Sequence, residues 1–323
     1  MAVQRRKLLL MGPAGVGKSS MRSVITGHAI AKDCARLGPT SSVEHSTVRF
    51  LGDMVLNLWD CGGQGKYVRD YFERQREQVF SLAALLIFVF DATDDLGGVD
   101  ESGGAGGGGG SGSGGDELTG MQFFGKCAAF LAEFSPDARI FVLVHKMDLV
   151  PPESRARLFA DTEALALASA GDMRDRVSTF ATSIWDETLY RAWSAIVCEL
   201  VPNVQVLERQ LATFCDACEA DEAVLFERAS FLVIAHAARR RHGDGQRYEK
   251  ISNIIKQFKL SVNRQQARFE SISVGNSGFS AVIEAFTATT YIMVVTSKPG
   301  VYTAGTRLNI NVARVHFAAL LEG

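Results

Sequence analysis

The sequence predicts an α/β domain with a mostly parallel sheet, followed by a smaller α+β domain. Over residues 1–201, apolar runs with the length of buried strands alternate with helical patterns, and this order builds a parallel sheet covered by helices. A glycine-rich loop joins the first strand to the first helix. Over residues 202–323 the pattern changes to helices and closely spaced strands, which favours an antiparallel sheet.

The glycine-rich loop, residues 12–19, reads GPAGVGKS and follows an apolar run. It fits the pattern G-x-x-x-x-G-K-[ST], in which backbone N–H groups point at phosphate oxygens and the next helix adds its positive N-terminus. We expect Lys18 to reach the β- and γ-phosphates of a nucleotide and Ser19 to bind Mg²⁺. The alternative is a simple glycine turn, but the strand and helix that the phosphate motif requires are both present. The nucleotide ligands expected in this segment are Gly12, Gly15, Val16, Gly17, Lys18, Ser19 and Ser20.

The charge and hydropathy of the chain exclude two classes of protein. Its net charge is -2 and its pI is near 6.3, whereas a general nucleic-acid binder is basic, so we expect no nucleic-acid partner. The longest apolar run, residues 82–90, is far shorter than the roughly 20 residues that span a bilayer. Position 2 is alanine, whereas myristoylation needs a glycine there, and the last residues include no cysteine for prenylation. We therefore expect no lipid anchor of either kind. We therefore expect a soluble, cytoplasmic protein that reaches membranes only through partners.

The six cysteines are scattered, and the N-terminus leads into a strand without a signal peptide. Both features favour a cytosolic protein with free thiols. Cys215 and Cys218 form a C-x-x-C pattern that zinc sites also use, but no second pair of ligands accompanies it. Because both lie on the apolar face of an expected helix, we favour core packing over metal binding.

The other elements of the first domain are assigned by periodicity and turn residues. Residues 83–90 are apolar throughout, as expected for a central strand covered on both faces. Residues 33–46 are polar and contain a proline, so we expect a mobile loop. Residues 97–115 are almost entirely glycine, serine and acids, which predicts a disordered insert. The remaining expected elements are a helix from the glycine-rich loop to residue 31, strands at 47–51, 54–59, 139–144 and 178–181, and helices at 67–80, 118–134, 153–168 and 189–201.

The second domain is expected to begin after Pro202, which ends the preceding helix. The turn at 276–278, Asn-Ser-Gly, separates the first two of three strands and indicates an antiparallel meander. Because this part lacks paired acids, histidine clusters and nucleophile motifs, we expect dimerisation or partner docking rather than catalysis. Its expected elements are helices at 204–218, 248–258 and 308–320, and strands at 229–235, 269–274, 279–286 and 291–295.

Three adjacent arginines, 239–241, lie in a turn of the second domain. They could meet an acidic partner or an anionic lipid. A solvated loop is the favoured interpretation, since short charge runs are usually solvated.

The phosphate-binding loop is followed by Thr40, Asp60 and Gln64, and later by the motif 145–148. The order and spacing of these residues resemble those of the Ras-like small GTPases. The resemblance covers about residues 7–201. It implies a Ras-like P-loop GTPase domain in which Thr40 and Asp60 join Ser19 around Mg²⁺. The Gly63 amide would contact the γ-phosphate, and Gln64 would be the catalytic residue that orients the attacking water.

The same resemblance indicates which residues would select the base. His145, Lys146 and Asp148 occupy the guanine-specificity position, where Asp148 would accept two N–H bonds from an edge that adenine does not offer. Ser183 and Ile184 match the last base-contacting loop, with a backbone amide for the guanine oxygen. His145 stands where Ras-like proteins usually have asparagine. The implied cofactors are GTP or GDP, and Mg²⁺.

Longer stretches of the sequence point to one family within the Ras-like small GTPases. Residues 59–64 (WDCGGQ), 145–148 (HKMD), 182–190 (TSIWDETLY) and 250–260 (KISNIIKQFKL) are similar to the Rag family of small GTPases, and in particular to its RagA/RagB-type subunits. The resemblance implies a C-terminal roadblock-like dimerisation domain at 202–323, which forms a heterodimer with a RagC/RagD-type GTPase. It also implies docking to a membrane scaffold complex at the lysosome or vacuole, and recruitment of the TOR kinase complex when amino acids are plentiful.

The leading hypothesis is a regulatory GTPase switch, in which the γ-phosphate orders residues 33–46 and 60–72 and hydrolysis releases them. Hydrolysis should be slow without a GTPase-activating protein, because no arginine is clearly placed to act in cis; Arg36 is interpreted as a surface residue. A second hypothesis is a structural heterodimer subunit whose nucleotide mainly stabilises the fold. A third, a P-loop metabolite kinase, does not explain Gln64 or the motif 145–148.

Overall fold

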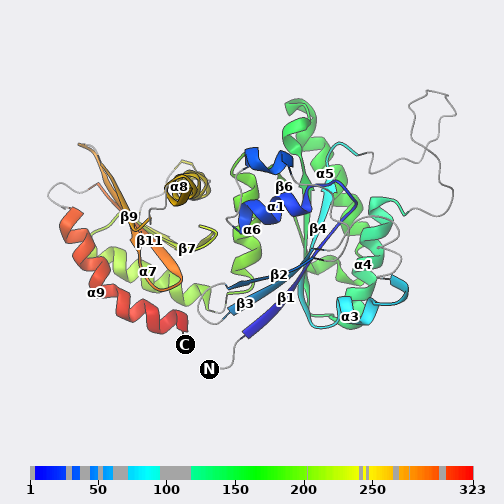
Figure 1. Cartoon of the computed structure of the whole chain (residues 1–323), viewed down its shortest axis with the longest axis horizontal. Helices are drawn as coiled ribbons and strands as arrows, with labels where there is room; N and C mark the ends of the chain where they lie inside the picture. Colours follow the sequence, from blue (N-terminus) through cyan, green and yellow to red (C-terminus); the bar gives the residue numbers. More distant parts are fainter. Residues whose placement is uncertain are drawn as a thin grey trace.

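The computed structural model describes residues 4–26, 31–36, 44–49, 54–60, 72–94, 118–201, 203–239, 243–244, 247–264, 269–275, 277–297 and 303–322. Within these ranges the chain forms two lobes, each built around its own β-sheet (Figure 1). Among the described residues, no helix combines the length and the apolar character that a membrane span needs. The expected insert at 97–115 lies outside the described residues, as do Thr40, Gly63 and Gln64.

The sheet of the N-terminal lobe has six strands in the order β2-β3-β1-β4-β5-β6. Its neighbouring strands pair in parallel, except that β2 runs antiparallel to β3. The predicted mostly parallel sheet is therefore confirmed. The strands are β1 Gln4–Met11, β2 Glu44–Arg49, β3 Met54–Asp60, β4 Ala83–Asp91, β5 Arg139–His145 and β6 Val177–Thr182.

Helices cover both faces of this sheet, which gives the three layers of an α/β domain (Figure 1). Two helices, α1 and α6, pack on one face, and α3, α4 and α5 pack on the other. The α4 helix starts at a capping box formed by Thr119 and Gln122. The helices are α1 Lys18–Ile25, α3 Arg76–Phe80, α4 Gly120–Phe134, α5 Pro152–Ser169 and α6 Thr188–Cys198, with 3₁₀ segments η1 Ala31–Arg36, η2 Met147–Leu149 and η3 Gly171–Arg176.

The first helix is shorter than the sequence predicts. It ends at Ile25 with Thr26 as its C-cap, rather than at residue 31. The Thr26 hydroxyl donates to the carbonyl oxygen of Arg22 at 2.8 Å. Lys256, from the C-terminal lobe, donates to the carbonyl oxygens of Val24 and Ile25. Side chains thus satisfy the last carbonyls of α1, which a further turn of helix would otherwise satisfy.

Two neighbouring boundaries also differ from prediction. The expected mobile loop, 33–46, contributes to η1 and to the start of β2, where Glu44 pairs opposite Asp60. The expected helix at 67–80 is represented among the described residues by helical residues 72–73, a turn and bend at 74–75, and α3. The rings of Phe72 and Phe80 lie 6.4 Å apart, whereas a continuous helix would separate residues eight positions apart by about 12 Å along its axis. Burial of both rings in one cluster accounts for the bend.

The sheet of the C-terminal lobe has five antiparallel strands in the order β8-β7-β11-β10-β9. One face is covered by α8 and the other by α7 and α9. The predicted α+β class and the meander are confirmed. The elements are α7 Val204–Cys218, β7 Glu222–Glu227, β8 Val233–Ala238, α8 Arg247–Arg264, β9 Ser271–Gly275, β10 Ser280–Ala285, β11 Thr290–Thr296 and α9 Thr303–Glu322.

The strand predicted at 229–235 is misplaced, because β8 begins only at Val233, and β7 is not predicted from the sequence. The buried carboxylate of Glu227 explains the difference. It accepts hydrogen bonds from the backbone of Ala229 at 2.9 Å and from the backbone and hydroxyl of Ser230 at 2.6 Å. Phe231 then adopts a left-handed φ of 60°. These contacts fold the segment between β7 and β8 into a tight turn.

One core cluster extends through both lobes and centres on α6. The hydroxyl oxygen of Ser194 on α6 accepts a hydrogen bond from the backbone of Val233 at 3.2 Å. The thiol of Cys198 donates to the carbonyl of Ile234 at 3.4 Å. Since β8 is an edge strand of the second sheet, α6 of the first lobe covers part of that edge.

Two sequence features of the C-terminal lobe allow two interpretations each. The C-x-x-C pair could pack in the core or bind metal, and the arginines 239–241 could be solvated or meet a partner. Cys215 is fully buried in the core and Cys218 is half-buried. Burial raises the pKa of the Cys215 thiol to about 12. Arg239 pairs with Asp216 of the same lobe at 3.1 Å, while Arg240 and the residue after it lie outside the described residues.

Candidate nucleotide-binding site

The loop between β1 and α1 has a backbone that glycine alone adopts easily. Gly12, Gly15 and Gly17 have φ values of 144°, 81° and 97°. A Cβ added at Gly12 would stand 2.3 Å from the carbonyl oxygen of Val89 on β4. The glycine pattern is therefore required by the conformation of the loop and by its close approach to the sheet.

Lys18 begins α1 and folds back across this loop. It is 6% exposed, and its Nζ donates to the carbonyl oxygens of Gly12 at 2.8 Å and Pro13 at 2.7 Å. No side chain caps α1 at Gly17, and its first turn contains no acidic residue. A glycine loop that opens a helix with a lysine at its start is the arrangement that binds phosphate groups.

Three polar residues stand side by side at the carboxyl ends of neighbouring strands. Asp91 of β4 pairs with His145 of β5, and His145 pairs with Thr182 of β6. All three are buried. In parallel α/β sheets, ligands bind at this edge. The phosphate-binding loop follows β1 at the same edge.

Asp91 is held by hydrogen bonds from two residues. Its carboxylate pairs with Lys146, and it accepts bonds from the backbone of Thr93 at 2.9 Å and from the Thr93 hydroxyl at 2.7 Å. Burial would raise the pKa of Asp91, but the bonds from Lys146 and Thr93 outweigh it and lower the pKa. Lys146 itself has a left-handed φ of 63°. The ion pair therefore helps to hold an unusual backbone conformation in the motif 145–148.

The imidazole of His145 connects the motif 145–148 to the rest of the edge. It is 2% exposed, and its Nδ1 lies 3.0 Å from the hydroxyl oxygen of Thr182. Its ring borders Gly17. Burial lowers the pKa of His145 to about 4, more than the nearby carboxylate of Asp148 raises it, so the imidazole is neutral at pH 7.

The remaining candidate base-specificity residues lie in the next two loops. The half-buried carboxylate of Asp148 has no hydrogen-bond partner within the part of the chain that the structure describes. The backbone N–H of Ser183 donates to the Thr188 hydroxyl at 2.9 Å. Of the two candidate amides, Ile184 is thus the one that no described residue engages.

The candidate residues around the γ-phosphate are only partly described. Thr40, Gly63 and Gln64 lie outside the described residues. The backbone of Asp60 ends β3 and pairs with Leu10 of β1, just before the phosphate-binding loop. The strand order therefore brings the chain at Asp60 to the loop.

Asp91 and Thr182 are two residues of this edge that are not predicted from the sequence. Each is the polar residue that ends a buried or half-buried strand. That position is a usable signal, because the carboxyl ends of parallel strands meet at one edge. Their direct contact with the motif 145–148 depends on strand register, which single segments do not reveal.

Comparison with known proteins gives a consistent result. Residues 7–255 match the family model described as the Gtr1/RagA G protein conserved region. The chain is 48% identical over 318 residues to Ras-related GTP-binding protein A of Dictyostelium discoideum, covering 98% of each chain. It is 44% identical over 312 residues to GTP-binding protein gtr1 of Schizosaccharomyces pombe, covering 96% of this chain and 94% of the other. Identity to gtr2 of the same yeast is only 26%, over 275 residues, covering 84% and 79%.

Proposed function

Because the chain belongs to the Gtr1/RagA family of GTP-binding proteins, we propose that it is a regulatory GTPase switch that binds GTP or GDP and slowly converts GTP to GDP and phosphate. The main support is one edge of the N-terminal sheet, where the phosphate-binding loop borders His145. His145 in turn is in register with Asp91 and Thr182. A nucleotide needs such a pair of adjoining sites, one for phosphates and one for the base.

The phosphates would be held by the loop 12–17, by Lys18 and by the first turn of α1, including Ser20. Ser19, Asp60 and Thr40 would hold Mg²⁺. Hydroxyl and carboxylate oxygens are ligands that this cation takes, and Ser19 lies in the first turn of α1 while the backbone of Asp60 ends the neighbouring strand β3. The metal would neutralise charge on the phosphate oxygens.

Guanine would be selected by Asp148 and the amide of Ile184. The carboxylate of Asp148, to which no described residue donates a hydrogen bond, can accept both N–H groups of the guanine edge, and the Ile184 amide can donate to the guanine oxygen. Lys146 and neutral His145 would fix the loop that presents Asp148.

Hydrolysis would depend on Gln64, which orients the attacking water. A GTPase-activating protein would accelerate the reaction by supplying missing transition-state stabilisation, which can be worth about 10³ to 10⁵ in rate. In the GTP state, contacts with the γ-phosphate would order the segments around Thr40 and Gln64.

The C-terminal lobe, residues 202–323, would be a roadblock-like domain that forms a heterodimer with a RagC/RagD-type GTPase. Two exposed features of its described residues support this assignment. Leu308, Val312 and Val315 recur at helical spacing on α9 and are 64%, 73% and 77% exposed. The strand β9 forms an edge of the second sheet, where a strand of a partner can pair. The identity pattern, 44% to gtr1 against 26% to gtr2, supports assigning this chain to the RagA/RagB side of such a pair.

The heterodimer would bind a membrane scaffold complex at the lysosome or vacuole. In its GTP state it would recruit the TOR kinase complex when amino acids are plentiful. Family membership is the support for this part of the proposal.

The test compares proteins that co-purify with three tagged variants in native cells. Gln64→Leu should retain GTP, and Ser19→Asn should lose the triphosphate state because Mg²⁺ binding is weakened. Ser23→Asn, the same substitution further along α1, is the matched control. A RagC/RagD-type subunit should appear with every variant, and TOR-complex components should be enriched with Gln64→Leu and depleted with Ser19→Asn. An identical set of proteins with all variants would instead support a structural subunit whose nucleotide stabilises the fold.

A further inference from the structure

A lysine of the C-terminal lobe reaches the helix that starts at the phosphate-binding loop. Lys256 lies on α8 and is 2% exposed. Its Nζ donates to the carbonyl oxygen of Val24 and, at 2.9 Å, to that of Ile25. The same atom lies 5.3 Å from the centre of the Tyr190 ring on α6. One side chain therefore joins α8 to the C-terminal end of α1.

These hydrogen bonds explain why the interior tolerates a lysine. Burial lowers the pKa of Lys256 to about 7; Glu227 opposes this effect and Lys259 adds to it. A buried amine is costly unless its N–H groups find acceptors. The last carbonyls of a helix have no partners within the helix and carry partial negative charge. The amine of Lys256 thus donates hydrogen bonds to the last carbonyl oxygens of α1. Separating α8 from α1 would leave the amine and these carbonyl oxygens without these hydrogen bonds.

The helix between Lys256 and the phosphate site is short. It has eight residues, which corresponds to about 12 Å. Its first turn contains Lys18 and Ser19, which would contact the phosphates and Mg²⁺. Its last residues, Val24 and Ile25, accept the bonds from Lys256. Because such a short helix moves as a unit, a shift at the phosphate end also displaces the end that Lys256 contacts.

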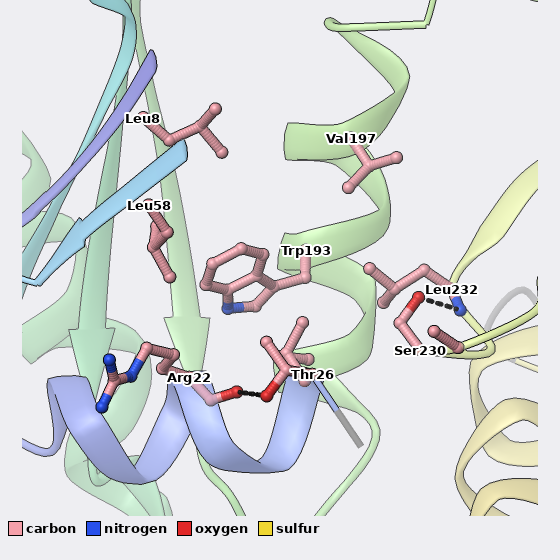
Figure 2. A pocket seen from close by; sticks show the side chains of 10 residues that line it. Leu8, Arg22, Thr26, Leu58, Trp193, Val197, Ser230 and Leu232 are labelled. Carbon is pink, nitrogen blue, oxygen red and sulfur yellow. Dashed lines mark hydrogen bonds between the residues drawn. The ribbon is translucent and has the colours of Figure 1, made fainter. Parts of the chain in front are cut away.

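The side of α1 that faces the C-terminal lobe is incompletely packed. A cavity of about 30 Å³ lies between α1, α6 and residues 229–232. Figure 2 shows the indole of Trp193 between Leu58 and Thr26, with Ser230 on the side of the C-terminal lobe. Trp193 is 3% exposed, and its Nε1 has no hydrogen-bond partner among the described residues. The cavity leaves α1 room to shift, which Lys256 restrains.

The neighbouring helix α6 is attached to the C-terminal lobe by separate contacts. Ser194 and Cys198 bind the backbone of β8, and Glu187 pairs with Lys250 of α8 at 3.9 Å. These contacts do not involve α1. Movement of α1 therefore need not break these contacts between α6 and the C-terminal lobe.

We propose that Lys256 is a positioning residue for the nucleotide site, which couples the binding of phosphates at the start of α1 to the position of the C-terminal lobe. This inference rests on the function proposed above. Coupling between two sites is reciprocal. The Lys256 contact slows nucleotide release, and bound nucleotide stabilises the contact between α1 and α8.

The test compares Lys256→Met with Lys259→Met in the full-length protein. Methionine keeps an unbranched chain but removes the amine. Lys259 is the matched control, because it lies on the same helix and donates to the carbonyl of Arg228. It also lies over the rings of Phe231 and Tyr291. All these contacts of Lys259 are within the C-terminal lobe.

Release of fluorescent GDP and GTP analogues is the first measurement. We expect Lys256→Met to accelerate release at least about fivefold and Lys259→Met to change it less than about twofold. Hydrogen exchange is the second measurement, since a purely structural role would not change its response to nucleotide. GTP should slow exchange in α8 of the wild type and Lys259→Met, but not of Lys256→Met. Equal release rates in the two variants, or an equal response of α8 in all three proteins, would overturn the inference.

A second variant covers the case in which Lys256→Met does not fold. Lys256→Gln keeps an N–H donor of shorter reach, and it should also accelerate release relative to Lys259→Met. A wild-type protein that does not retain guanine nucleotides contradicts the proposed function itself. A wild-type protein that retains them, but releases them no more slowly than the folded Lys256 variant, contradicts only the role of Lys256.

Discussion

The ring of His145 lies against Gly17 so closely that a Cβ added to the glycine would stand 2.9 Å from Cδ2 and 3.1 Å from Nε2 of the imidazole. The motif 145–148 and the phosphate-binding loop are therefore in direct contact. His145 is also fixed at Nδ1 by Thr182, so the ring has little freedom to retreat. A change at Gly17 should consequently affect the base-binding edge as well as the phosphates.

Gly17→Ala should weaken nucleotide binding more than Gly15→Ala. Both glycines have positive φ, which costs about 1–2 kcal/mol for an L-residue. A Cβ at Gly15 meets nothing within 4 Å, whereas one at Gly17 meets His145. Calorimetry should show at least about a tenfold greater loss of GDP affinity for Gly17→Ala, equivalent to about 1.4 kcal/mol. Equal losses would mean that the contact with His145 does not matter for binding.

The buried imidazole of His145 also predicts a pH dependence of stability. Its pKa is about 4 in the folded protein and about 6.5 in an unfolded chain. Above pH 6.5 the imidazole is neutral in both states. As the pH falls from 6.5 to 4, the unfolded chain takes up the proton first, so the free energy of unfolding decreases, by about 3 kcal/mol in total.

The measurement is chemical denaturation of the wild type and His145→Asn at two pH values. Asparagine does not titrate, so the variant removes only this contribution to the pH dependence. From pH 7 to pH 5 the wild type should lose about 2 kcal/mol more than the variant. Parallel losses in the two proteins would show that His145 is not responsible.

The sequence predicts the first lobe well where the signal is local. The apolar runs at β4 and β5 and the glycine pattern at 12–19 each require only adjacent residues, and all are found in the expected elements. The end of α1 is different, because it depends on Lys256, which is 231 residues away from Ile25. No local pattern contains that information.

The misplaced strand of the second lobe has a similar cause. Residues 229–235 are suitable for a strand, but the carboxylate of Glu227 binds the backbone of Ala229 and Ser230 and imposes a turn. A buried glutamate that accepts backbone N–H groups cannot be recognised from hydropathy. The contact of Asp91 with Lys146 likewise depends on the register of β4 and β5.

Asp91→Asn should loosen the motif 145–148. The amide is neutral, so Lys146 loses its ion pair while the shape of the side chain is kept. We expect the free energy of unfolding to fall by about 1–3 kcal/mol and GDP release to become faster. Thr93→Val removes one hydroxyl donor to Asp91 but keeps the ion pair, and it should have a smaller effect on release. Stopped-flow release of labelled GDP would contradict the prediction if Thr93→Val were the faster variant.

Val312→Asp should disrupt the proposed heterodimer without unfolding the chain. Val312 is 73% exposed on α9, between Leu308 and Val315. A surface substitution of this kind changes the free energy of unfolding by about 0.5 kcal/mol or less, but it would bury a charge in an apolar interface. Leu165→Asp, at a 41% exposed position of α5, is the control. Co-expression with a RagC/RagD-type subunit should give at least about a tenfold weaker dimer for Val312→Asp alone.

Asp148→Asn should change which base the protein binds. A carboxylate offers only acceptors, which match the two N–H groups of guanine, whereas an asparagine amide offers one acceptor and one donor. Xanthine has an N–H group beside a carbonyl oxygen and therefore matches the amide. Because no described residue donates a hydrogen bond to the Asp148 side chain, the substitution should leave the protein framework unchanged. We expect GDP affinity to fall at least about a hundredfold and xanthosine diphosphate affinity to rise. Asp172→Asn, an exposed acid in η3, should alter neither. A variant that lost GDP without gaining xanthosine diphosphate would show that Asp148 supports the loop instead of contacting the base.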